Sequence, residues 1–480
     1  MLTGLWTVVG LLAGVEIASG VLQGYYTPVF SDIADSLRIS DGDVNWFEAA
    51  QLIVAALVVP LLARLGDLWG HRTVLLLSTA VTALGSWVMA FAPGFTTFLI
   101  GSALQGAYVV WLPLEIAIVY RRTAGHPEQG RLTRKAAAFL VAALELGVIA
   151  GALTSGMLVE ATSMRVLLSL PAVVVTLALV VIWFGLEHHP GQSGGGIDWP
   201  GLALVTTVLG LIMAGLVVVR LQGPGSPLAW SLVLLGLVAV VPLVRIEAAT
   251  PEPLIDVRLL ASPGQWPLQL TAMLFGVSVL GAQIPLSTFA RSDPAVTGYG
   301  LGADAAFVST LIGLYVVSLM VGALSLPLAS RVLGARGALV AGALLVAAGY
   351  ALWLPFHDTT GQALLNMAVA GVGSGVLVAA LPAAAAAAAP ASRTGFATGM
   401  TNATKTVGGA VASAVFAIAL TSTGSIDDPS AGAASLGGYL AVWSICSGTA
   451  LLAALALLLT RSPRQLLDVS HSEQPDPTTA

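Results

Sequence analysis

Five ionisable side chains lie inside long apolar stretches of the chain or at their edges, where a charge is costly. A charge at the centre of a bilayer costs about 2.5–3.5 kcal/mol on insertion scales, so each needs a structural or functional reason. A carboxylate in such a place can take up and release a proton, and a lysine can neutralise a carboxylate or hold an anionic group. The five residues are Glu16, Glu48, Glu115, Glu145 and Lys405.

Glu16 is the strongest candidate for a proton carrier. It shares one helical face with Gln23, two turns further on, and this polar face is expected to point into a central cavity. The alternative is a structural pair, with Lys405 as a candidate partner. For Glu145, a proton site and a structural pairing are equally supported. Glu48 is near the outer end of its stretch, so we favour a solvated residue at the cavity mouth.

A second set of candidates follows one face of a predicted helix at spacings close to three and four residues. Such a stripe can contact a bound organic molecule, although packing or lipid contact explains its aromatic members equally well. The stripe comprises Gln105, Tyr108, either Trp111 or Leu112, and Glu115.

The composition is that of a polytopic membrane protein, because 57% of the 480 residues are hydrophobic, 9% are charged and the mean hydropathy is +0.91. No G-x-x-x-x-G-K-[ST] sequence is present, so ATP is not expected to drive the protein directly. The six histidines are scattered over predicted loops and the tail, and Cys446 is the single cysteine. We therefore expect no metal site, disulfide, cofactor or nucleic-acid partner.

About fourteen apolar runs are long enough to cross a bilayer as helices. The run after Met1 lacks the basic start of a signal peptide and is expected to be the first span. The spans are predicted at 5–28, 46–64, 73–92, 96–120, 136–159, 165–186, 199–220, 228–246, 267–290, 305–330, 336–356, 360–381, 393–422 and 435–460.

Basic residues are divided unevenly between the two predicted faces, and the richer face is expected to be cytoplasmic. An even number of crossings then places both termini in the cytoplasm, with the chain in the inner membrane of the cell. The poorer face has only Arg38, Arg165, Arg220 and Arg291. Its first loop carries Asp32, Asp35, Asp41 and Asp43, which we interpret as solvated loop charges.

A short charged link between the second and third spans is predicted to turn at the cytoplasmic face, where its glycines permit a tight turn. This link resembles the G-D-x-x-G-[HR]-R signature of the major facilitator superfamily. A shortened copy, Pro327–Arg336, falls between the tenth and eleventh spans and lacks the Gly-Asp pair. Asp67 therefore has no counterpart in the shortened copy, and it is expected to help hold a cytoplasmic gate closed. The predicted gate residues are Arg64, Gly66, Asp67, Gly70 and Arg72.

The resemblance implies an all-α membrane fold of two six-helix bundles that rock about a central site, with two inserted helices. It covers nearly the whole chain and is nearest to the fourteen-helix drug/proton antiporter branch. The predicted parts are an N-terminal bundle at 1–186, a cytoplasmic linker at 187–198, the inserted pair at 199–246, a second linker at 247–266, a C-terminal bundle at 267–460 and a disordered tail at 461–480.

Two spans depart from the pattern of that branch. In the fourth span Ser102 stands where the branch carries an arginine that is thought to serve proton exchange. The fifth span keeps a small-residue face for close packing at Gly147, Gly151 and Gly156, but Ala152 replaces the usual proline. The departures weaken the inference about the direction of transport more than the inference about the fold.

Residues and resemblance together favour a proton-coupled secondary exporter of amphipathic or lipophilic compounds, working by alternating access as a monomer. The expected partners are a small-molecule substrate, protons and the lipid bilayer. The acidic balance of the expected cavity mildly favours cationic or zwitterionic cargo. A lipid or glycolipid exporter and a proton-coupled uptake symporter of the same fold stay open, and a membrane-embedded enzyme or sensor is a remote alternative.

Overall fold

The computed structural model describes residues 2–124, 126–187, 196–251, 253–390, 393–421 and 434–459, which form helices and connecting turns without a strand. The predicted tail and most of the predicted linker at 187–198 lie outside the described residues. The first part of the chain forms α1 (Leu2–Tyr25), η1 (Thr27–Val29), α2 (Phe30–Leu37), α3 (Asn45–Trp69), α4 (His71–Ala90), α5 (Phe95–Gln105), η2 (Gly106–Val110), α6 (Trp111–Arg122), α7 (Gln129–Leu158) and α8 (Met164–Gly185). The rest forms α9 (Trp199–Gln222), α10 (Pro227–Ala249), α11 (Val257–Leu260), α12 (Trp266–Val279), α13 (Gln283–Arg291), α14 (Pro294–Thr297), α15 (Ala305–Leu352), α16 (Thr360–Ala387), α17 (Thr394–Leu420) and α18 (Leu436–Leu459).

Within the described residues, 13 helical segments are long and apolar enough to cross a membrane. One of them, α15, is 48 residues long and contains Gly334 in a non-helical conformation with φ 75° and ψ 164°. Glycine adopts this positive φ without the steric penalty that a Cβ atom brings. The helix therefore contains two crossings that meet at Gly334, and the number of spans agrees with the prediction. The link between α3 and α4 likewise turns at a glycine with positive φ, Gly70.

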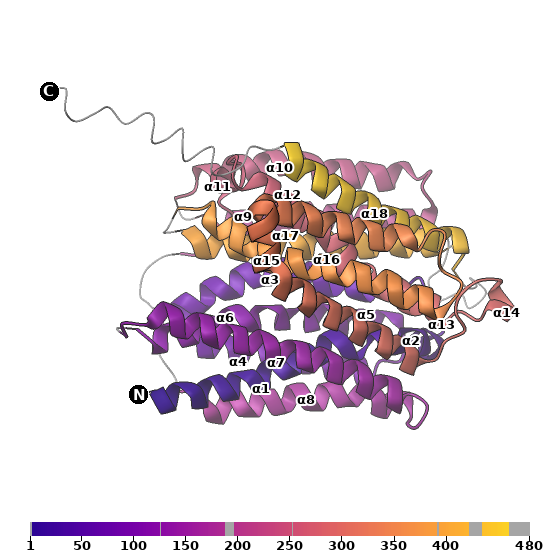
Figure 1. The fold of residues 1–480 in the computed structure, drawn as a ribbon, viewed down its shortest axis with the longest axis horizontal. Coiled ribbons are helices and arrows are strands. Elements are labelled where there is room, and N and C mark those ends of the chain that lie inside the picture. Colours follow the sequence, from indigo (N-terminus) through magenta and orange to yellow (C-terminus); the bar gives the residue numbers. More distant parts are fainter. Residues whose placement is uncertain are drawn as a thin grey trace.

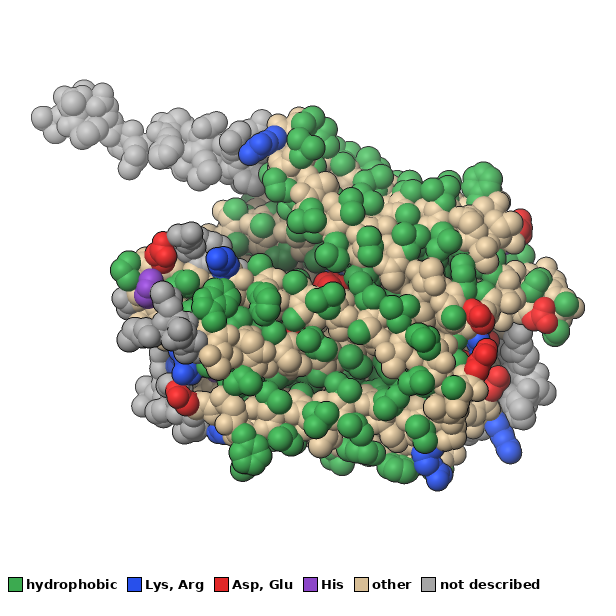
Figure 2. Space-filling view, turned by 60° about the horizontal axis from the view of Figure 1, so that its bottom comes forward, with side chains coloured by type: hydrophobic (Ala, Val, Ile, Leu, Met, Phe, Trp, Pro, Cys, Tyr) green, Lys and Arg blue, Asp and Glu red, His purple; other side chains and the backbone are tan. Residues whose placement is uncertain are grey.

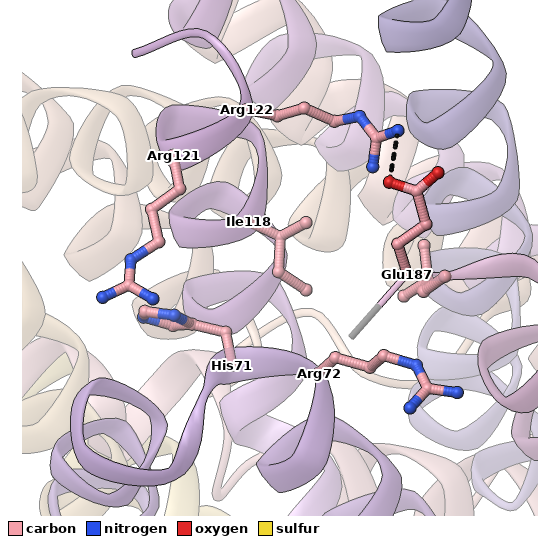
Figure 3. Close-up of a pocket in the computed structure, with 7 residues that line it drawn as sticks. His71, Arg72, Ile118, Arg121, Arg122 and Glu187 are labelled. Atoms are coloured by element: carbon pink, nitrogen blue, oxygen red, sulfur yellow. Dashed lines mark hydrogen bonds and ion pairs between the residues drawn. The ribbon is translucent and has the colours of Figure 1, made fainter. Parts of the chain in front are cut away.

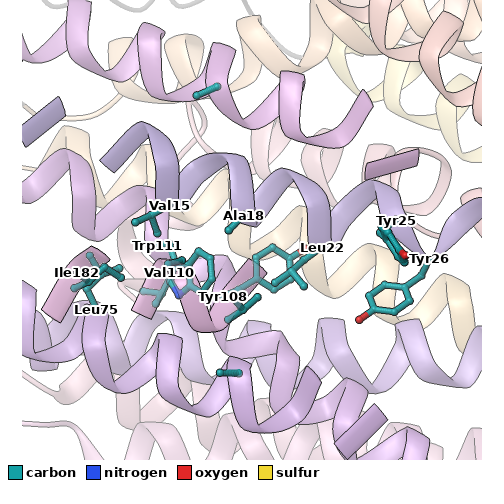
Figure 4. Close-up of a cluster of buried hydrophobic side chains, with 14 of the residues drawn as sticks. Val15, Ala18, Leu22, Tyr25, Tyr26, Leu75, Tyr108, Val110, Trp111 and Ile182 are labelled. Carbon is teal, nitrogen blue, oxygen red and sulfur yellow. The ribbon is translucent and has the colours of Figure 1, made fainter. Parts of the chain in front are cut away.

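The helices gather into two bundles that lie side by side, with α1–α8 mainly below and α12–α18 mainly above in Figure 1. Each bundle has its own buried apolar core, one built mainly by residues between Leu5 and Leu186 and the other by residues between Leu268 and Leu457. Figure 4 shows part of the first core, where α1 side chains such as Ala18 and Leu22 lie beside Tyr108.

The inserted helices α9 and α10 pack on each other, and α9 also reaches the seam between the bundles. A small apolar cluster joins α9 to α3 of one bundle and α17 of the other. Its members include Met213, Leu216, Val217, Trp46, Ala49, Ala414 and Ala417.

We call the end of the molecule that holds Gly66–Arg72 the motif face and the other end the opposite face. In Figure 1 the N-terminus marks the motif face on the left, whereas α2, α13 and α14 lie at the opposite face on the right. Leu177, Leu234 and Leu324 are among the exposed apolar side chains of the long helices. Figure 2 shows hydrophobic side chains spread over one side of the molecule between these ends, as lipid-facing helices require. The chain is a multi-pass membrane protein.

Hydrogen bonds join the two bundles near the opposite face. The contacts run from Ser287 Oγ to the Thr27 carbonyl, from Arg291 Nη2 to Asp32 Oδ1 at 2.6 Å, from Ser309 Oγ to the Ala152 carbonyl at 2.7 Å and from Ser413 Oγ to Glu48 Oε2 at 3.2 Å. These contacts hold the bundles together at the opposite face, and Figure 2 shows a hollow between them toward the motif face.

Candidate functional site

A cavity, which we call the central cavity, lies between the bundles toward the opposite face; most of its lining comes from the N-terminal bundle, and Leu280 and Gln283 come from the other. Its empty volume is about 650 Å³, including space open to solvent. The polar lining comprises Gln23, Tyr26, Thr27, Glu48, Gln51, Ser102, Gln105, Tyr108 and Gln283, and the apolar lining comprises Leu22, Phe30, Phe47, Leu52, Met89, Phe98 and Leu280. A few polar groups on apolar walls are typical of sites for small organic molecules. Four predicted site residues, Gln23, Glu48, Gln105 and Tyr108, therefore meet here.

The fourth span is broken next to this cavity, which the sequence did not predict. Helix α5 ends at Gln105, the 3₁₀ segment η2 follows, and α6 begins at Trp111. At the break, Gly106 packs so closely on α3 that a Cβ atom would stand 2.3 Å from the Gln51 carbonyl oxygen. This close approach fixes the break against α3 and presents Tyr108 to the cavity.

Gln105 is held by two hydrogen bonds. Its Nε2 donates to Tyr26 Oη at 3.0 Å and to Ser86 Oγ at 2.9 Å. The missed partner Ser86 belongs to a buried polar stripe on α4, with Ser78, Thr79 and Thr82, whose helical spacing was visible in the sequence. At the position where the antiporter branch carries an arginine, Ser102 donates to the Phe98 carbonyl at 3.0 Å, so its hydroxyl is satisfied within α5.

Glu48 lies between the bundles at the cavity. Its carboxylate accepts the hydrogen bond from Ser413 Oγ of α17 and lines the cavity together with Gln51. Its side chain is partly buried, and α17 packs on α3 here. The interpretation as a solvated residue at the cavity mouth stays a prediction.

Glu16 and Glu115 form a carboxyl pair inside the N-terminal bundle. Both side chains are 0% exposed, and the two carboxyl groups are in hydrogen-bonding contact with each other. None of their four oxygens accepts a hydrogen bond from a donor group among the described residues. A hydrogen bond between the two groups therefore requires a proton on one of them. The sequence marked both residues but did not predict that they pair.

Trp111 does not line the central cavity. Its side chain is fully buried and packs edge-on against Tyr108, with ring centroids 6.1 Å apart. Of the two alternatives for this aromatic residue, packing is the one that the structure shows.

Glu145 of α7 and Lys405 of α17 belong to different bundles and interact electrostatically. Lys405 therefore acts on Glu145, whereas the partner of Glu16 is Glu115. Both residues are only partly buried, near the middle of their helices. Two charges of opposite sign thus influence each other from the two bundles.

The glycines of α7 pack against two different partners. Cβ atoms at Gly147 and Gly151 would stand 2.4 Å and 3.0 Å from backbone atoms of α1, inside the same bundle. At Gly156 a Cβ atom would stand 2.2 Å from Ser309 Oγ of α15, in the other bundle. Only Gly156 therefore lies at the interface between the bundles.

The charged link at the motif face is shorter than predicted, because α3 continues to Trp69 and only Gly70 separates it from α4. Gly66 lies inside α3 and serves packing, since a Cβ atom there would stand 2.8 Å from Leu114. Asp67 Oδ1 lies 3.4 Å from His71 Nε2, and Arg64 donates to the Gly196 carbonyl at 3.4 Å. The predicted turn is thus made by Gly70 alone.

Comparison with known proteins agrees with this architecture. A family model described as Major Facilitator Superfamily matches residues 12–292, more than half of the chain, and one described as Sugar (and other) transporter matches residues 270–478. The cephamycin export protein CmcT of Amycolatopsis lactamdurans is 28% identical over 410 residues, which are 83% of this chain and 81% of CmcT. The uridine/deoxyuridine transporter of Lactococcus lactis subsp. cremoris is 26% identical over 340 residues, 68% of each chain.

Solved structures share the fold. The crystal structure of an auto-inhibited POT family peptide transporter superposes with a TM-score of 0.67 at 16% identity, covering 100% of this chain and 99% of that one. The family model and this likeness confirm the predicted family and fold class.

Proposed function

Because the chain belongs to the Major Facilitator Superfamily, we propose that it is a proton-coupled exporter that carries amphipathic organic molecules out of the cytoplasm by alternating access. The observation that carries the proton-coupling part is the donor-free carboxyl pair of Glu16 and Glu115. Two carboxylates in contact in a dry site cannot both be charged, so one proton is shared between them. Such a pair is a proton-binding site by its geometry.

The pair is connected to the cavity through the helices that hold it. Glu16 is on α1, which also supplies Gln23 and Leu22 to the cavity wall, and Glu115 is on α6, which follows the η2 segment with Tyr108. Loss of the shared proton would leave charge in the contact between α1 and α6 and weaken it. A change in that contact would reach the cavity through both helices, which is how proton release and cargo binding can be coupled.

The arrangement of the bundles supports a state that opens on one side only. Hydrogen bonds join the bundles at the opposite face, and the hollow of Figure 2 opens toward the motif face. We assign the motif face to the cytoplasm because it carries most of the basic residues. Both termini then lie in the cytoplasm, and Asp67 belongs to the contacts of a cytoplasmic gate that closes in the other state.

The cavity lining supports amphipathic cargo, because apolar walls are combined with amide, hydroxyl and carboxylate groups. The similarity to the cephamycin export protein supports export. The similarity to the uridine/deoxyuridine transporter supports a second candidate, uptake of nucleosides. The four amides of Gln23, Gln51, Gln105 and Gln283 favour that candidate, since amides can pair with the hydrogen-bonding edge of a base.

The test begins with a ligand panel screened by quenching of the eleven tryptophans. A hit is then loaded into proteoliposomes, and transport is measured by counterflow without a pH gradient and by accumulation with one. We expect Glu16→Gln and Glu115→Gln to retain counterflow but lose gradient-driven accumulation at least tenfold, whereas the exposed Glu160→Gln behaves as wild type. Undiminished accumulation in both pair variants would exclude the pair as the coupling site. Inward transport of nucleosides alone, without the need for a cation gradient, would favour uptake.

A further inference from the structure

A second pocket, separate from the central cavity, opens on the motif face of the N-terminal bundle. Its empty volume is about 490 Å³, including space open to solvent. It is formed where the first turn of α4 meets the last turns of α6 and the chain that leaves α8. The lining residues are His71, Arg72, Ile118, Arg121, Arg122, Leu186 and Glu187.

The lining is strongly basic. Figure 3 shows Arg72, Arg121 and Arg122 around a space whose floor carries Ile118, with His71 beside Arg121. The one acid of the lining is Glu187, whose Oε2 accepts a hydrogen bond from Arg122 Nη2 at 3.1 Å. Its side chain is 70% exposed, so this carboxylate can be displaced at small cost.

One N–H donor at this pocket, Arg72 Nε, is buried without a hydrogen-bond partner among the described residues. The His71 side chain is only 8% exposed, and its Nε2 faces Asp67. Arg72 Nη2 donates to the Trp183 carbonyl at 2.7 Å, which holds the guanidinium in place. A buried donor without an acceptor leaves a hydrogen bond unmade, so an acceptor-rich ligand beside Arg72 Nε would satisfy it.

The backbone adds to the attraction for an anion. Helix α4 is 20 residues long and begins at His71, so its N-terminal amide groups and the positive end of its dipole lie at the pocket. Arginine guanidinium groups match the oxygen atoms of phosphate in paired hydrogen bonds. The chemistry that fits is therefore a phosphate group.

We propose that this pocket binds the phosphate of an anionic phospholipid, and that Glu187 occupies the site when no lipid is bound. The position of exposed aromatic side chains supports a lipid source. Trp183 and Phe184 at the end of α8 are 61% and 82% exposed, and Tyr120 at the end of α6 is 55% exposed. Exposed aromatic residues of this kind lie at the headgroup level of a bilayer.

The proposal makes lipid and Glu187 competitors for the same arginines. Glu187 begins the connection from α8 to the inserted pair, so a bound phosphate would release that connection from Arg122. Removing the charge of Glu187 should therefore strengthen lipid binding, whereas removing an arginine should weaken it. The opposite signs of these two effects separate a competitive site from general attraction to a basic surface.

Native mass spectrometry of the full chain in detergent tests this, with phosphatidylglycerol, phosphatidylcholine and inorganic phosphate as probes. We expect phosphatidylglycerol to bind at least tenfold more tightly than phosphatidylcholine. Arg121→Gln and Arg122→Gln should each lower its affinity about tenfold, Glu187→Gln should raise it several-fold, and the exposed Arg245→Gln on α10 should leave it unchanged. Thermal unfolding of each variant identifies any that fails to fold. The Arg122 side chain is 27% exposed, so we expect Arg122→Gln to fold.

Three outcomes would overturn the proposal. The first is equal binding of the two lipids by the wild-type protein, and the second is unchanged phosphatidylglycerol affinity in the arginine variants. The third is inorganic phosphate that binds and displaces Glu187 while phosphatidylglycerol does not, which would assign the pocket to a soluble anion.

Discussion

Arg220 of the inserted helix α9 holds Asp43, which lies just before α3, in a buried ion pair with two hydrogen bonds. Arg220 Nε donates to Asp43 Oδ1 at 2.9 Å and Nη2 donates to Oδ2 at 2.8 Å, and the two side chains are 1% and 0% exposed. Ser40 Oγ also donates to Asp43 Oδ2, at 2.8 Å. The interpretation of Asp43 as a solvated loop charge was therefore wrong in this structure, because α9 covers it.

Breaking this pair should destabilise the fold strongly. We expect Arg220→Met to lower the free energy of unfolding by about 3–5 kcal/mol, because it leaves the carboxylate of Asp43 buried without its partner. The double variant Asp43→Leu, Arg220→Met should regain most of the loss, since no unpaired charge remains. Denaturant unfolding in detergent measures both, with the exposed Arg165→Met as the control. A single variant as stable as that control would contradict the prediction.

Transport should require the charges of both Glu145 and Lys405. We expect Lys405→Met and Glu145→Gln each to lower transport at least tenfold, because each leaves one charge without its neighbour across the seam. The double variant should recover part of the activity in counterflow. If the loss of transport in the double variant equals the combined losses of the two single variants, the two residues act independently and their interaction does not contribute to transport.

Closure at the opposite face should depend on pH through Asp41. Burial first, and then the nearby Asp35, raise the pKa of this carboxyl to about 6 against the opposing effect of Ser31 and Arg291. When the face opens and Asp41 is hydrated, its pKa should fall to the ordinary value near 3.8. The closed state then binds more protons between these values, so closure is favoured as pH falls through about 6 and weakened above it.

Distances between spin labels on α2 and α14, measured from pH 7.5 to pH 5, would report this change. Asp41→Asn imitates the protonated side chain, so we expect it to keep the face closed across the range. Asp32, Asp35, Tyr299 and Tyr439 are further titratable groups near Asp41. If the pH midpoint of the distance change is the same in Asp41→Asn as in the wild-type protein, the pH dependence belongs to one of these other groups.

Two glycines of α1 provide a matched pair for the close packing of α1 on α7. A Cβ atom at Gly20 would stand 2.0 Å from the Leu144 carbonyl oxygen, whereas a Cβ atom at Gly10 would meet nothing within 4 Å. We expect Gly20→Ala to cost about 1–3 kcal/mol through forced separation of the helices. Gly10→Ala should be neutral or stabilise by about 0.5–1 kcal/mol, because alanine is the better helix former. Equal unfolding midpoints for the two variants would contradict this reading of the packing.

The sequence by itself determined the features that depend on neighbouring residues. The lengths of the apolar runs predicted the spans, and the glycines of the first link predicted a turn that Gly70 makes, because span length and backbone conformation are local properties. The cost of a buried charge also singled out Glu16, Glu115, Glu145 and Lys405 without any knowledge of their partners.

Only the tertiary structure decided how those residues are paired. Glu16 could face the cavity or a neighbouring helix, and the rotation of α1 against α6 places it against Glu115. Lys405 interacts electrostatically with Glu145 because the two bundles bring α7 and α17 to the same side of the interface, and Arg220 reaches Asp43 because α9 covers the start of α3. Each pair joins residues about 100 or more positions apart, and their contact is set by helix rotation and close backbone packing that no local pattern of the sequence contains.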